Sequence, residues 1–268
     1  MDILKAGILG IVEGVTEWLP VSSTGHLILV NEFLKLNMTP EFMSVFNVVI
    51  QLGAIFAVLL IYFNKLNPFA KSKSQLEKTN TFNLWTKVIV AVMPSAILGL
   101  LFDDYIEAKF FNPVVVSIML IVYGIIMIIM ENKQSTSKIK NLEDLTYKTA
   151  IFIGLFQCLA LIPGTSRSAS TIIGAVLLGA SRFVATEFSF FLAIPTMLGA
   201  SALKLLKAGF VFSGLEWLIL GVGTVVSFGV SVFVIKMLLD YIKKHDFKVF
   251  GYYRIILGAL ILLYFSLV

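Results

Sequence analysis

Two glutamates within an apolar stretch are the first residues whose type and spacing suggest chemistry. Glu13 and Glu17 lie four residues apart, so on a helix both carboxylates point to the same side. Two ionised carboxylates that are buried together repel each other unless a cation lies between them. Because a hard divalent cation prefers oxygen ligands, the pair predicts a site for Mg²⁺ or Ca²⁺. A pair that shares a proton, or a glutamate hydrogen-bonded to the backbone, is the alternative.

A cluster of hydroxyl groups, Ser22, Ser23 and Thr24, follows shortly after Pro20. Proline interrupts one helix and serine or threonine starts the next, so the first amides of the new helix point into the break. The partial positive charge of that helix start predicts an anion site, and simple capping would need only one hydroxyl. His26 lies three residues after Ser23, so its ring can lie over the hydroxyl and take its proton. A purely structural histidine is the alternative.

A second apolar stretch breaks in the same manner. Thr165, Ser166 and Arg167 follow Pro163, and a guanidinium keeps its charge and binds phosphate oxygens through a planar pair of donors. The arginine is also a candidate counter-ion for one of the two glutamates, and both roles are compatible. Two helix starts, an arginine and a cation around one point suit a diphosphate better than a single carboxylate.

Weaker candidates are polar residues that stand within or near other apolar stretches. Gln51 and Glu187 are candidates for substrate binding, with hydrogen bonding between helices as the alternative. Gln157 is expected to line the same cavity as Glu13.

The composition indicates a membrane protein. Of the 268 residues, 58% are hydrophobic and 14% charged, whereas soluble domains average about 45–50% and about 25%. The low share of charged residues excludes a disordered tail and a nucleic-acid-binding domain, although the net charge is +5. Cys158 is the only cysteine, which excludes an intrachain disulfide and a cysteine-based metal site. The chain starts without a recognisable signal peptide, so we expect none to be removed.

The apolar residues form six blocks of the length that a membrane-spanning helix requires. These blocks are 42–63, 83–102, 113–130, 183–206, 215–239 and 250–267. Two further stretches, 6–33 and 150–181, contain the breaks described above, and each of their arms is too short to cross a bilayer. We expect each to form a helical hairpin that enters the membrane and leaves on the same side, with its break buried in protein or facing a wet cavity.

Charged residues between the blocks predict the orientation of the chain. One set of segments holds 15 Lys or Arg and 6 Asp or Glu, a net charge of +9: 64–87, 131–148, 182 and 236–254. The other set holds 5 and 7, a net charge of −2: 1–5, 32–41, 103–112 and 204–216. The first set is therefore expected in the cytoplasm, with both termini and the mouth of the first hairpin outside. Four ionisable residues remain for the membrane interior or its edge: Glu13, Glu17, Arg167 and Glu187.

The two hairpins resemble each other. Gly10 to Val15 is similar to Gly154 to Leu159 at an offset of 144 residues, and Pro20 to Ser23 is similar to Pro163 to Ser166 at 143 after one deletion. Three predicted spans follow each hairpin, and because three is odd the second copy is upside down relative to the first. We predict one all-α integral membrane domain, residues 1–268, with an inverted-topology repeat. Each half, about 1–130 and about 146–268, is a re-entrant helix hairpin plus three transmembrane helices, unless the similarity arose by chance.

Two motifs carry a resemblance to a known family. The segment from Glu13 to Leu27 (EGVTEWLPVSSTGHL) and the segment from Pro163 to Ser168 (PGTSRS) resemble the signatures of the bacterial undecaprenyl-diphosphatases of the bacitracin-resistance type. Glu187 to Phe190 and the Gln51 segment also resemble family stretches, so the resemblance covers nearly the whole chain. The second motif of the family often has an aromatic residue where Thr165 stands.

The resemblance implies an activity and a location. It implies an enzyme of the bacterial plasma membrane that removes the terminal phosphate of undecaprenyl diphosphate and so recycles the lipid carrier of cell-wall synthesis. It also implies a divalent cation, an active site open to the external face, and a homodimer.

Together with the residue chemistry, the resemblance leads to a hypothesis for each site residue. Glu13 and Glu17 hold the metal, with Glu17 also in the catalytic set. Ser23 is the preferred nucleophile with His26 as its base, and Arg167 stabilises the charge of the transferring phosphoryl group. A metal-activated water, with Ser23 positioning the phosphate, is the variant of this mechanism. The substrate-binding candidates are Ser22, Thr24, Thr165, Ser166, Gln51 and Glu187.

A secondary transporter or a polyprenyl-phosphate flippase is the alternative function. Inverted repeats, broken helices and ionisable residues at mid-membrane are features of transporters. Two hydroxyl-rich helix starts with an arginine and a histidine nearby favour phosphate hydrolysis, and the two activities are compatible.

Overall fold

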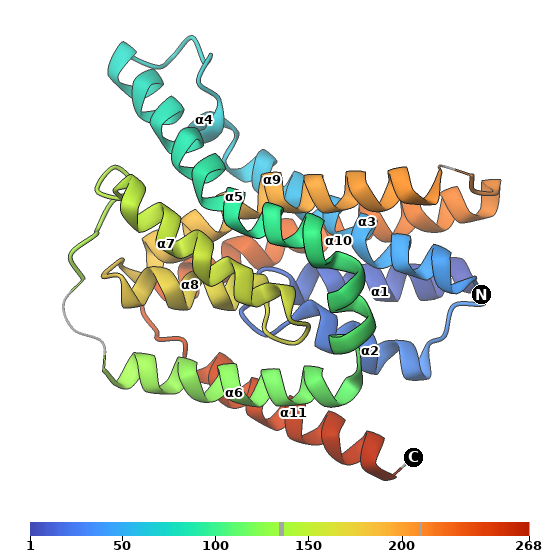
Figure 1. Cartoon of the computed structure of the whole chain (residues 1–268). Helices are drawn as coiled ribbons and strands as arrows, with labels where there is room; N and C mark the ends of the chain where they lie inside the picture. The colour runs from blue at the N-terminus through green and yellow to red at the C-terminus, as the bar shows by residue number, and fades with distance from the viewer. Residues whose placement is uncertain (134–136, 210, 268) are drawn as a thin grey trace.

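A computed structural model describes residues 1–133, 137–209 and 211–267, and the regular structure in these ranges is helical (Figure 1). The helices of the first half are α1 (Asp2–Thr16), α2 (Ser23–Phe33), α3 (Pro40–Ile61), α4 (Phe63–Leu66), α5 (Gln75–Phe110) and α6 (Pro113–Asn132). Those of the second half are α7 (Tyr147–Cys158), the 3₁₀ turn η1 (Leu159–Leu161), α8 (Arg167–Leu177), α9 (Arg182–Ala208), α10 (Gly214–Ile242) and α11 (Lys248–Leu267).

Six of the described helices are long and apolar enough to cross a membrane, judged by length and composition. They are α3, α5, α6, α9, α10 and α11, with Gln75–Phe102 as the apolar part of α5. Each coincides with one of the six predicted blocks, which confirms that the chain is an all-α, multi-pass membrane protein. Their starts follow local rules: Ser74 with Glu77, and Ser213 with Glu216, form capping boxes at α5 and α10.

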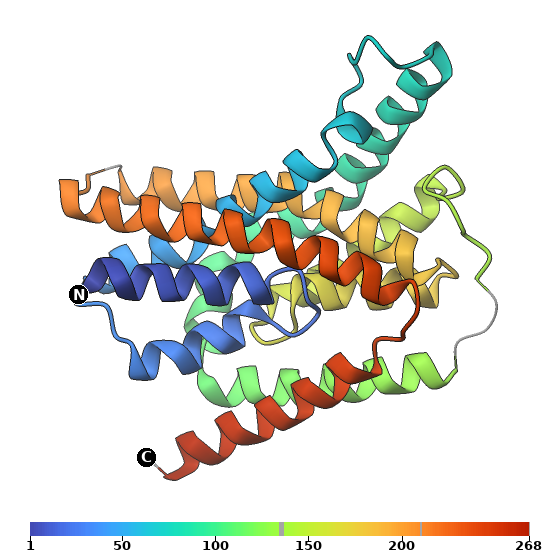
Figure 2. The ribbon, with the colours of Figure 1, turned by 180° about the vertical axis from the view of Figure 1, so that it is seen from behind.

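Four shorter helices form the two broken hairpins. In Figures 1 and 2, α1 begins near the end of the molecule where both termini lie, runs to the middle and is followed by α2, which returns. The pair α7 and α8 does the same from the opposite end. The two breaks, 17–22 and 162–166, therefore face each other in the interior.

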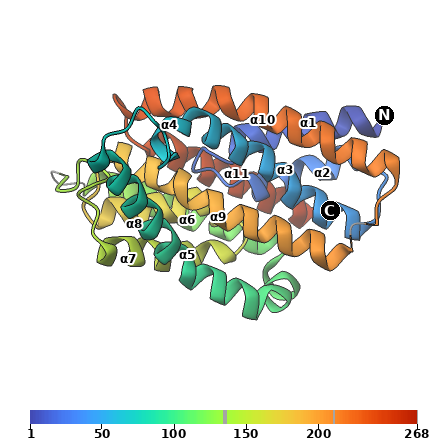
Figure 3. The ribbon, with the colours of Figure 1, turned by 90° about the horizontal axis from the view of Figure 1, so that it is seen from above.

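The long helices surround these hairpins. Seen from above (Figure 3), α3 and α9 run through the middle, α10 and α1 lie along one side, and α5 and α7 along the other. Helix α1 packs on α10, and α7 packs on α5. Helices α6 and α11 form a pair beneath the breaks (Figure 1).

Glycines allow the short helices to approach the long ones closely. A Cβ atom at Gly10 of α1 would lie 2.5 Å from the carbonyl oxygen of Gly223 in α10, and one at Gly14 would lie 2.7 Å from that of Ser227. On the other side, a Cβ atom at Gly154 of α7 would collide with the carbonyl of Ala91 in α5. Close backbone packing of this kind is typical of membrane helices, and it fixes the position of each break relative to the long helices.

Candidate active site

The carboxylate of Glu17, in the first break, accepts hydrogen bonds from a hydroxyl group and a guanidinium group. The Ser23 hydroxyl donates to Oε2 of Glu17 at 2.8 Å, and Nη2 of Arg167 donates to Oε1 of the same carboxylate at 2.8 Å. Glu17 is 6% exposed in its side chain and Arg167 10%, so this ion pair is shielded from water. The structure thus brings together three of the predicted site residues, and Arg167 comes from the opposite hairpin.

Both breaks contain the same unusual backbone conformation. Ser22 and Ser166 have φ of 73°, where non-glycine residues are rarely found, at a cost of about 1–3 kcal/mol each. Each serine caps the arm that follows: Oγ of Ser22 accepts from the amide of Gly25, and Oγ of Ser166 accepts from that of Ala169. The following residues, Ser23 and Arg167, are the first of α2 and α8. The strained caps therefore aim the hydroxyl and the guanidinium at the same carboxylate.

The two capping serines differ by one residue from the predicted match between the hairpins. Ser22 and Ser166 are 144 residues apart, the same offset as the first arms, whereas the prediction pairs Ser23 with Ser166. The prediction compares residue types around the prolines, and the caps compare backbone conformation.

The guanidinium of Arg167 also forms hydrogen bonds with the long helix α9. Its Nη1 donates to the carbonyl oxygen of Ser189 in α9 at 2.8 Å and contacts the hydroxyl of Ser189 at 3.2 Å. Its Cζ lies 5.6 Å from the centre of the Trp18 ring. Its Nε is buried and has no hydrogen-bond partner among residues 1–133, 137–209 and 211–267. One donor of the arginine is thus free for an oxygen of a ligand.

The surroundings of the Glu13 carboxylate bear on the predicted cation site. Its side chain is fully buried one helical turn before Glu17, and neither of its carboxylate oxygens has a hydrogen-bond partner in the part of the chain that the structure describes. Two buried oxygens without donors fit a hard cation. No cluster of three or more His, Cys, Asp or Glu residues occurs among the described residues, so the two glutamates would share such an ion with water, hydroxyl or phosphate oxygens.

His26 has other partners than Ser23. Its Nδ1 lies 2.7 Å from the carbonyl oxygen of Ser22, and its Nε2 lies 2.7 Å from the hydroxyl of Tyr253, whose ring stacks on the imidazole. A carbonyl only accepts, so in the neutral ring Nδ1 carries the proton and Nε2 accepts from Tyr253. The Ser23 hydroxyl donates its hydrogen bond to Glu17. His26 lies beside the break and forms no hydrogen bond with Ser23.

The substrate-binding candidates separate into two groups. Ser22, Ser166 and Thr165 lie in the breaks; the hydroxyl of Thr165 is buried and has no partner within the described ranges, and Oγ of Ser166 lies 3.1 Å from that of Ser168. Thr24 is half-buried in the first turn of α2. Glu187 lies apart from this group, because both of its oxygens accept from Nζ of Lys65, at 2.8 and 3.0 Å.

Arg254 is a site residue that the sequence analysis missed. It is fully buried on α11, and its Nη1 donates to the carbonyl oxygen of Pro20 at 3.1 Å. Its Nη2 donates to the carbonyls of Gly164 and Thr165 at 2.9 Å each, so this one side chain joins both breaks. Its assignment to the cytoplasmic segment 236–254 was wrong, because the carbonyls that the breaks leave unpaired supply partners for a buried guanidinium. The signal was available, since residue 254 lies inside the predicted apolar block 250–267.

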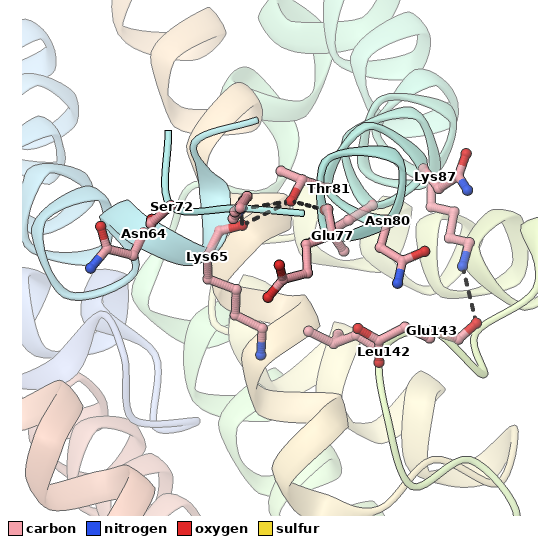
Figure 4. A pocket seen from close by; sticks show the side chains of 12 residues that line it. Asn64, Lys65, Ser72, Glu77, Asn80, Thr81, Lys87, Leu142 and Glu143 are labelled. Atoms are coloured by element: carbon pink, nitrogen blue, oxygen red, sulfur yellow. Dashed lines mark hydrogen bonds between the residues drawn. The ribbon is translucent and has the colours of Figure 1, made fainter. Parts of the chain in front are cut away.

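Two cavities bear on where a ligand could reach the site. One of about 460 Å³ lies at the end of the molecule where α4 joins α5 (Figure 4), and its lining includes Lys65, Glu77 and Lys87, with none of the predicted catalytic residues. The other, of about 350 Å³, is lined by Arg167 together with Gln51 and Gln157. The second cavity is therefore the one that reaches the site. Gln157 lines it, but Glu13, which was expected to line the same cavity, is not among its lining residues.

Comparison with known proteins finds relatives that match nearly the whole chain. The family described as "Bacitracin resistance protein BacA" matches residues 6–260. "Undecaprenyl-diphosphatase 1" of Clostridioides difficile is 67% identical over 267 residues, covering 100% of this chain and 97% of that protein. "Undecaprenyl-diphosphatase" of Enterococcus faecalis is 61% identical, covering 98% and 97%. "Undecaprenyl-diphosphatase" of Lactiplantibacillus plantarum is 57% identical, covering 100% and 99%.

Proposed function

The chain belongs to the bacitracin resistance protein BacA family, and from that premise we propose that it is an undecaprenyl-diphosphatase of the bacterial plasma membrane. The reaction releases the terminal phosphate of undecaprenyl diphosphate and leaves undecaprenyl phosphate, the lipid carrier of cell-wall synthesis. The observation that carries the proposal is the buried carboxylate of Glu17, which joins Ser23 of one break to Arg167 of the other.

The residues around this carboxylate suggest a two-step reaction. Oγ of Ser23 attacks the terminal phosphorus, its proton passes to Glu17, and the bond between that phosphorus and the bridging oxygen breaks, so that undecaprenyl phosphate leaves. Water then attacks the phosphoserine: its oxygen bonds to phosphorus as the Ser23 Oγ–P bond breaks, and Glu17 returns its proton to Ser23 Oγ. One proton of the water stays on the attacking oxygen and the other passes to a second phosphate oxygen, so that H₂PO₄⁻ leaves. Arg167 offers its free Nε to the phosphoryl oxygens, where charge must be stabilised in both steps.

Other residues of the breaks fit supporting roles. Ser22 and Ser166 cap the arms, and the first amides of α2 and α8 provide an anion-binding environment. Glu13 and Glu17 would hold a divalent cation, which when bound would neutralise phosphate charge and polarise a phosphoryl oxygen. His26 lies close enough to the break to assist a proton transfer after the substrate binds, although Glu17 is the better-placed acceptor for Ser23.

The architecture is proposed to be an inverted-topology repeat with two re-entrant hairpins. Three observations support it: the hairpins start from opposite ends of the molecule, their serine caps share one backbone conformation at an offset of 144, and α1 packs on α10 as α7 packs on α5. The repeats are about 1–130 and about 146–268. The homodimer implied by the family resemblance stays a prediction.

The orientation follows from the charge distribution and is testable by labelling. We expect Ser72 and Ser137 in the cytoplasm and Asn37 outside, with the active site open to the external face. Each residue is replaced by Cys in a Cys158→Ala background, and intact cells are treated with an impermeant thiol reagent. Labelling at 37 alone is the expected result. Labelling at 72 but not at 37 would reverse the assigned orientation.

The activity is tested with purified protein in detergent. We expect it to release phosphate from undecaprenyl diphosphate, and a chelator to stop the release until Mg²⁺ or Ca²⁺ is returned. Absence of phosphate release under all cation conditions would refute the proposed function.

The cation site has its own test. Glu13→Gln keeps the shape of the side chain and removes one of the two predicted anionic ligands, so we expect reduced turnover that partly recovers at higher cation concentration. The measurement is the cation concentration that gives half-maximal phosphate release, in the variant and the wild type. An unchanged cation requirement with wild-type turnover would show that Glu13 is not a ligand.

A further inference from the structure

A polar cavity lies at the end of the molecule opposite the two termini. There α4 and the first part of α5 project from the bundle (Figures 1 and 2). The cavity of about 460 Å³ is lined by α4, the loop that follows it, the first part of α5 and residues 142–143. Its volume falls in the range of about 300–1,000 Å³ that ligand pockets occupy, but such pockets are mostly apolar. Here all but two lining residues are polar or charged, which suits a charged ligand.

Three lysines meet at this cavity. Lys65 comes from α4, Lys73 from the loop and Lys87 from α5. In Figure 4 the side chains of Lys65 and Lys87 reach the cavity from opposite sides. The lining also contains two carboxylates, Glu77 and Glu143, so three positive and two negative groups leave a net charge of +1.

Two of the three ammonium groups have only neutral partners. Lys87 is 9% exposed, and its Nζ makes one hydrogen bond, of 3.4 Å, to the carbonyl oxygen of Glu143. Nζ of Lys73 donates to the carbonyl oxygen of Lys65 at 2.9 Å and to the hydroxyl of Thr81 at 2.7 Å. Within residues 1–133, 137–209 and 211–267, neither lysine forms an ion pair. A buried lysine normally has a charged partner, and an ammonium group has three donors, so both can accept an anion.

The carboxylates near the cavity are engaged elsewhere or exposed. Oε2 of Glu77 accepts from the amide and the hydroxyl of Ser74 at 2.7 and 2.8 Å, which caps α5. Glu143 is exposed, and in the described structure only its backbone carbonyl contacts a lysine of the cavity. Lys65 is paired with Glu187 of α9, with 2.8 Å between Nζ and Oε2. The uncompensated positive charge therefore belongs to the other two lysines.

We propose that this cavity binds a phosphate group, which is either the headgroup of an anionic membrane lipid or a free phosphate. Phosphate has several acceptor oxygens, so it can take hydrogen bonds from two ammonium groups at once, and lysine is a common phosphate ligand. The amide of Asn80, which also lines the cavity, adds a further donor. The proposal is independent of the proposed function, because no residue of the two breaks lines this cavity.

The test places a reporter at the cavity. Asn83 is an exposed lining residue, and Asn83→Cys in a Cys158→Ala background provides a single thiol for an environment-sensitive fluorophore. The labelled full chain in detergent micelles is titrated with phosphatidic acid, and diacylglycerol with the same acyl chains serves as the lipid without phosphate. A second titration uses inorganic phosphate, with sodium chloride at the same ionic strength as its control. The label lies away from the breaks, where the active site would bind phosphate itself.

We expect a saturable fluorescence change with phosphatidic acid and none with diacylglycerol. Lys87→Met and Lys73→Met should each raise Kd about ten-fold or more, the effect of losing one hydrogen bond to a charged group. Lys78→Met removes the same charge from α5 outside the lining, so its Kd should stay near the wild-type value. Glu143→Gln removes a negative charge from the lining and should lower Kd.

The two titrations identify the source of the phosphate. Saturable binding of inorganic phosphate as well as phosphatidic acid supports a site for free phosphate, and binding of phosphatidic acid alone supports a site for a lipid headgroup. No saturable change with either probe would overturn the proposal. Equal Kd values in the variants at Lys73, Lys87 and Lys78 would also overturn it. So would a higher Kd in Glu143→Gln, because that result would make the carboxylate a ligand and the occupant a cation.

Activity provides the control for folding. None of the four substituted residues belongs to the candidate active site, so each variant should release phosphate from undecaprenyl diphosphate with the wild-type kcat. Lys73 is less buried than Lys87, so Lys73→Met carries the test if Lys87→Met does not fold.

Discussion

Replacing Glu17 by Gln is expected to abolish nearly all turnover. The carboxylate is the only charged partner of the Arg167 guanidinium in a hydrogen bond of the described structure, and it is the acceptor of the Ser23 hydroxyl. An amide of the same shape cannot take the proton of the serine, and it leaves a buried guanidinium without its counter-charge. Loss of a positioned proton acceptor alone costs about 10²–10⁴ in rate. The measurement is kcat for phosphate release at saturating cation.

A matched variant separates this loss from a loss of stability. Glu131→Gln removes the same charge from another buried carboxylate, which pairs with Arg182 and accepts from the amide of Phe247, away from both breaks. Breaking the buried pair at Glu17 is expected to destabilise the fold by about 3–5 kcal/mol, and breaking the pair at Glu131 by less because Arg182 is partly exposed, but only the change at Glu17 should reduce kcat of the folded protein. Wild-type kcat in folded Glu17→Gln would contradict the mechanism.

A double variant tests whether Glu17 and Ser23 act together. Residues that work as one unit give strongly non-additive losses when both are removed. Ser23→Ala combined with Glu17→Gln is therefore expected to lose little more activity than Ser23→Ala alone. If the two losses instead multiply, Glu17 contributes independently of the serine proton.

Much of the site could be predicted because ionisable residues are costly in a membrane. In a chain with 14% charged residues, an acid or base within an apolar stretch needs a partner or a function, which singled out Glu13, Glu17 and Arg167. The breaks were predictable for a similar reason, since proline followed by serine or threonine ends one helix and starts another. These inferences use local spacing and composition, and both are present in the sequence.

Contacts between distant segments could not be predicted in this way. His26 meets Tyr253, which is 227 residues away in the chain, and nothing in the spacing around His26 indicates that partner. Arg254 was assigned to the segment 236–254 from the basic residues near it in the sequence. The carbonyls that bind it belong to the two breaks, which are distant in the chain. Ser22 and Ser166 share a backbone torsion angle, φ of 73°, and the residue types in the two stretches do not indicate it.

Replacing Arg167 by Lys is expected to lower kcat by about 10²–10³, the loss seen when one charge-stabilising donor is removed from an enzyme site. Lysine keeps the positive charge but loses the planar arrangement of donors, which here serve Glu17, the Ser189 carbonyl and a free Nε at once. Its ammonium is also more strongly hydrated, so burial beside Trp18 is less favourable. Binding of the substrate through its apolar tail should largely persist.

The same variant separates the enzyme from the transporter alternative. The measurements are steady-state kcat in detergent and binding of a non-hydrolysable diphosphate lipid, with Arg182→Lys as the control at an arginine whose carboxylate partner, Glu131, lies outside the breaks. A large fall in kcat with retained binding indicates that Arg167 stabilises the transferring phosphoryl group. If Arg167 serves only as a counter-ion for Glu17, lysine restores that charge and kcat stays near normal. That outcome would remove the catalytic role and favour a protein in which the paired breaks carry a lipid phosphate across the membrane.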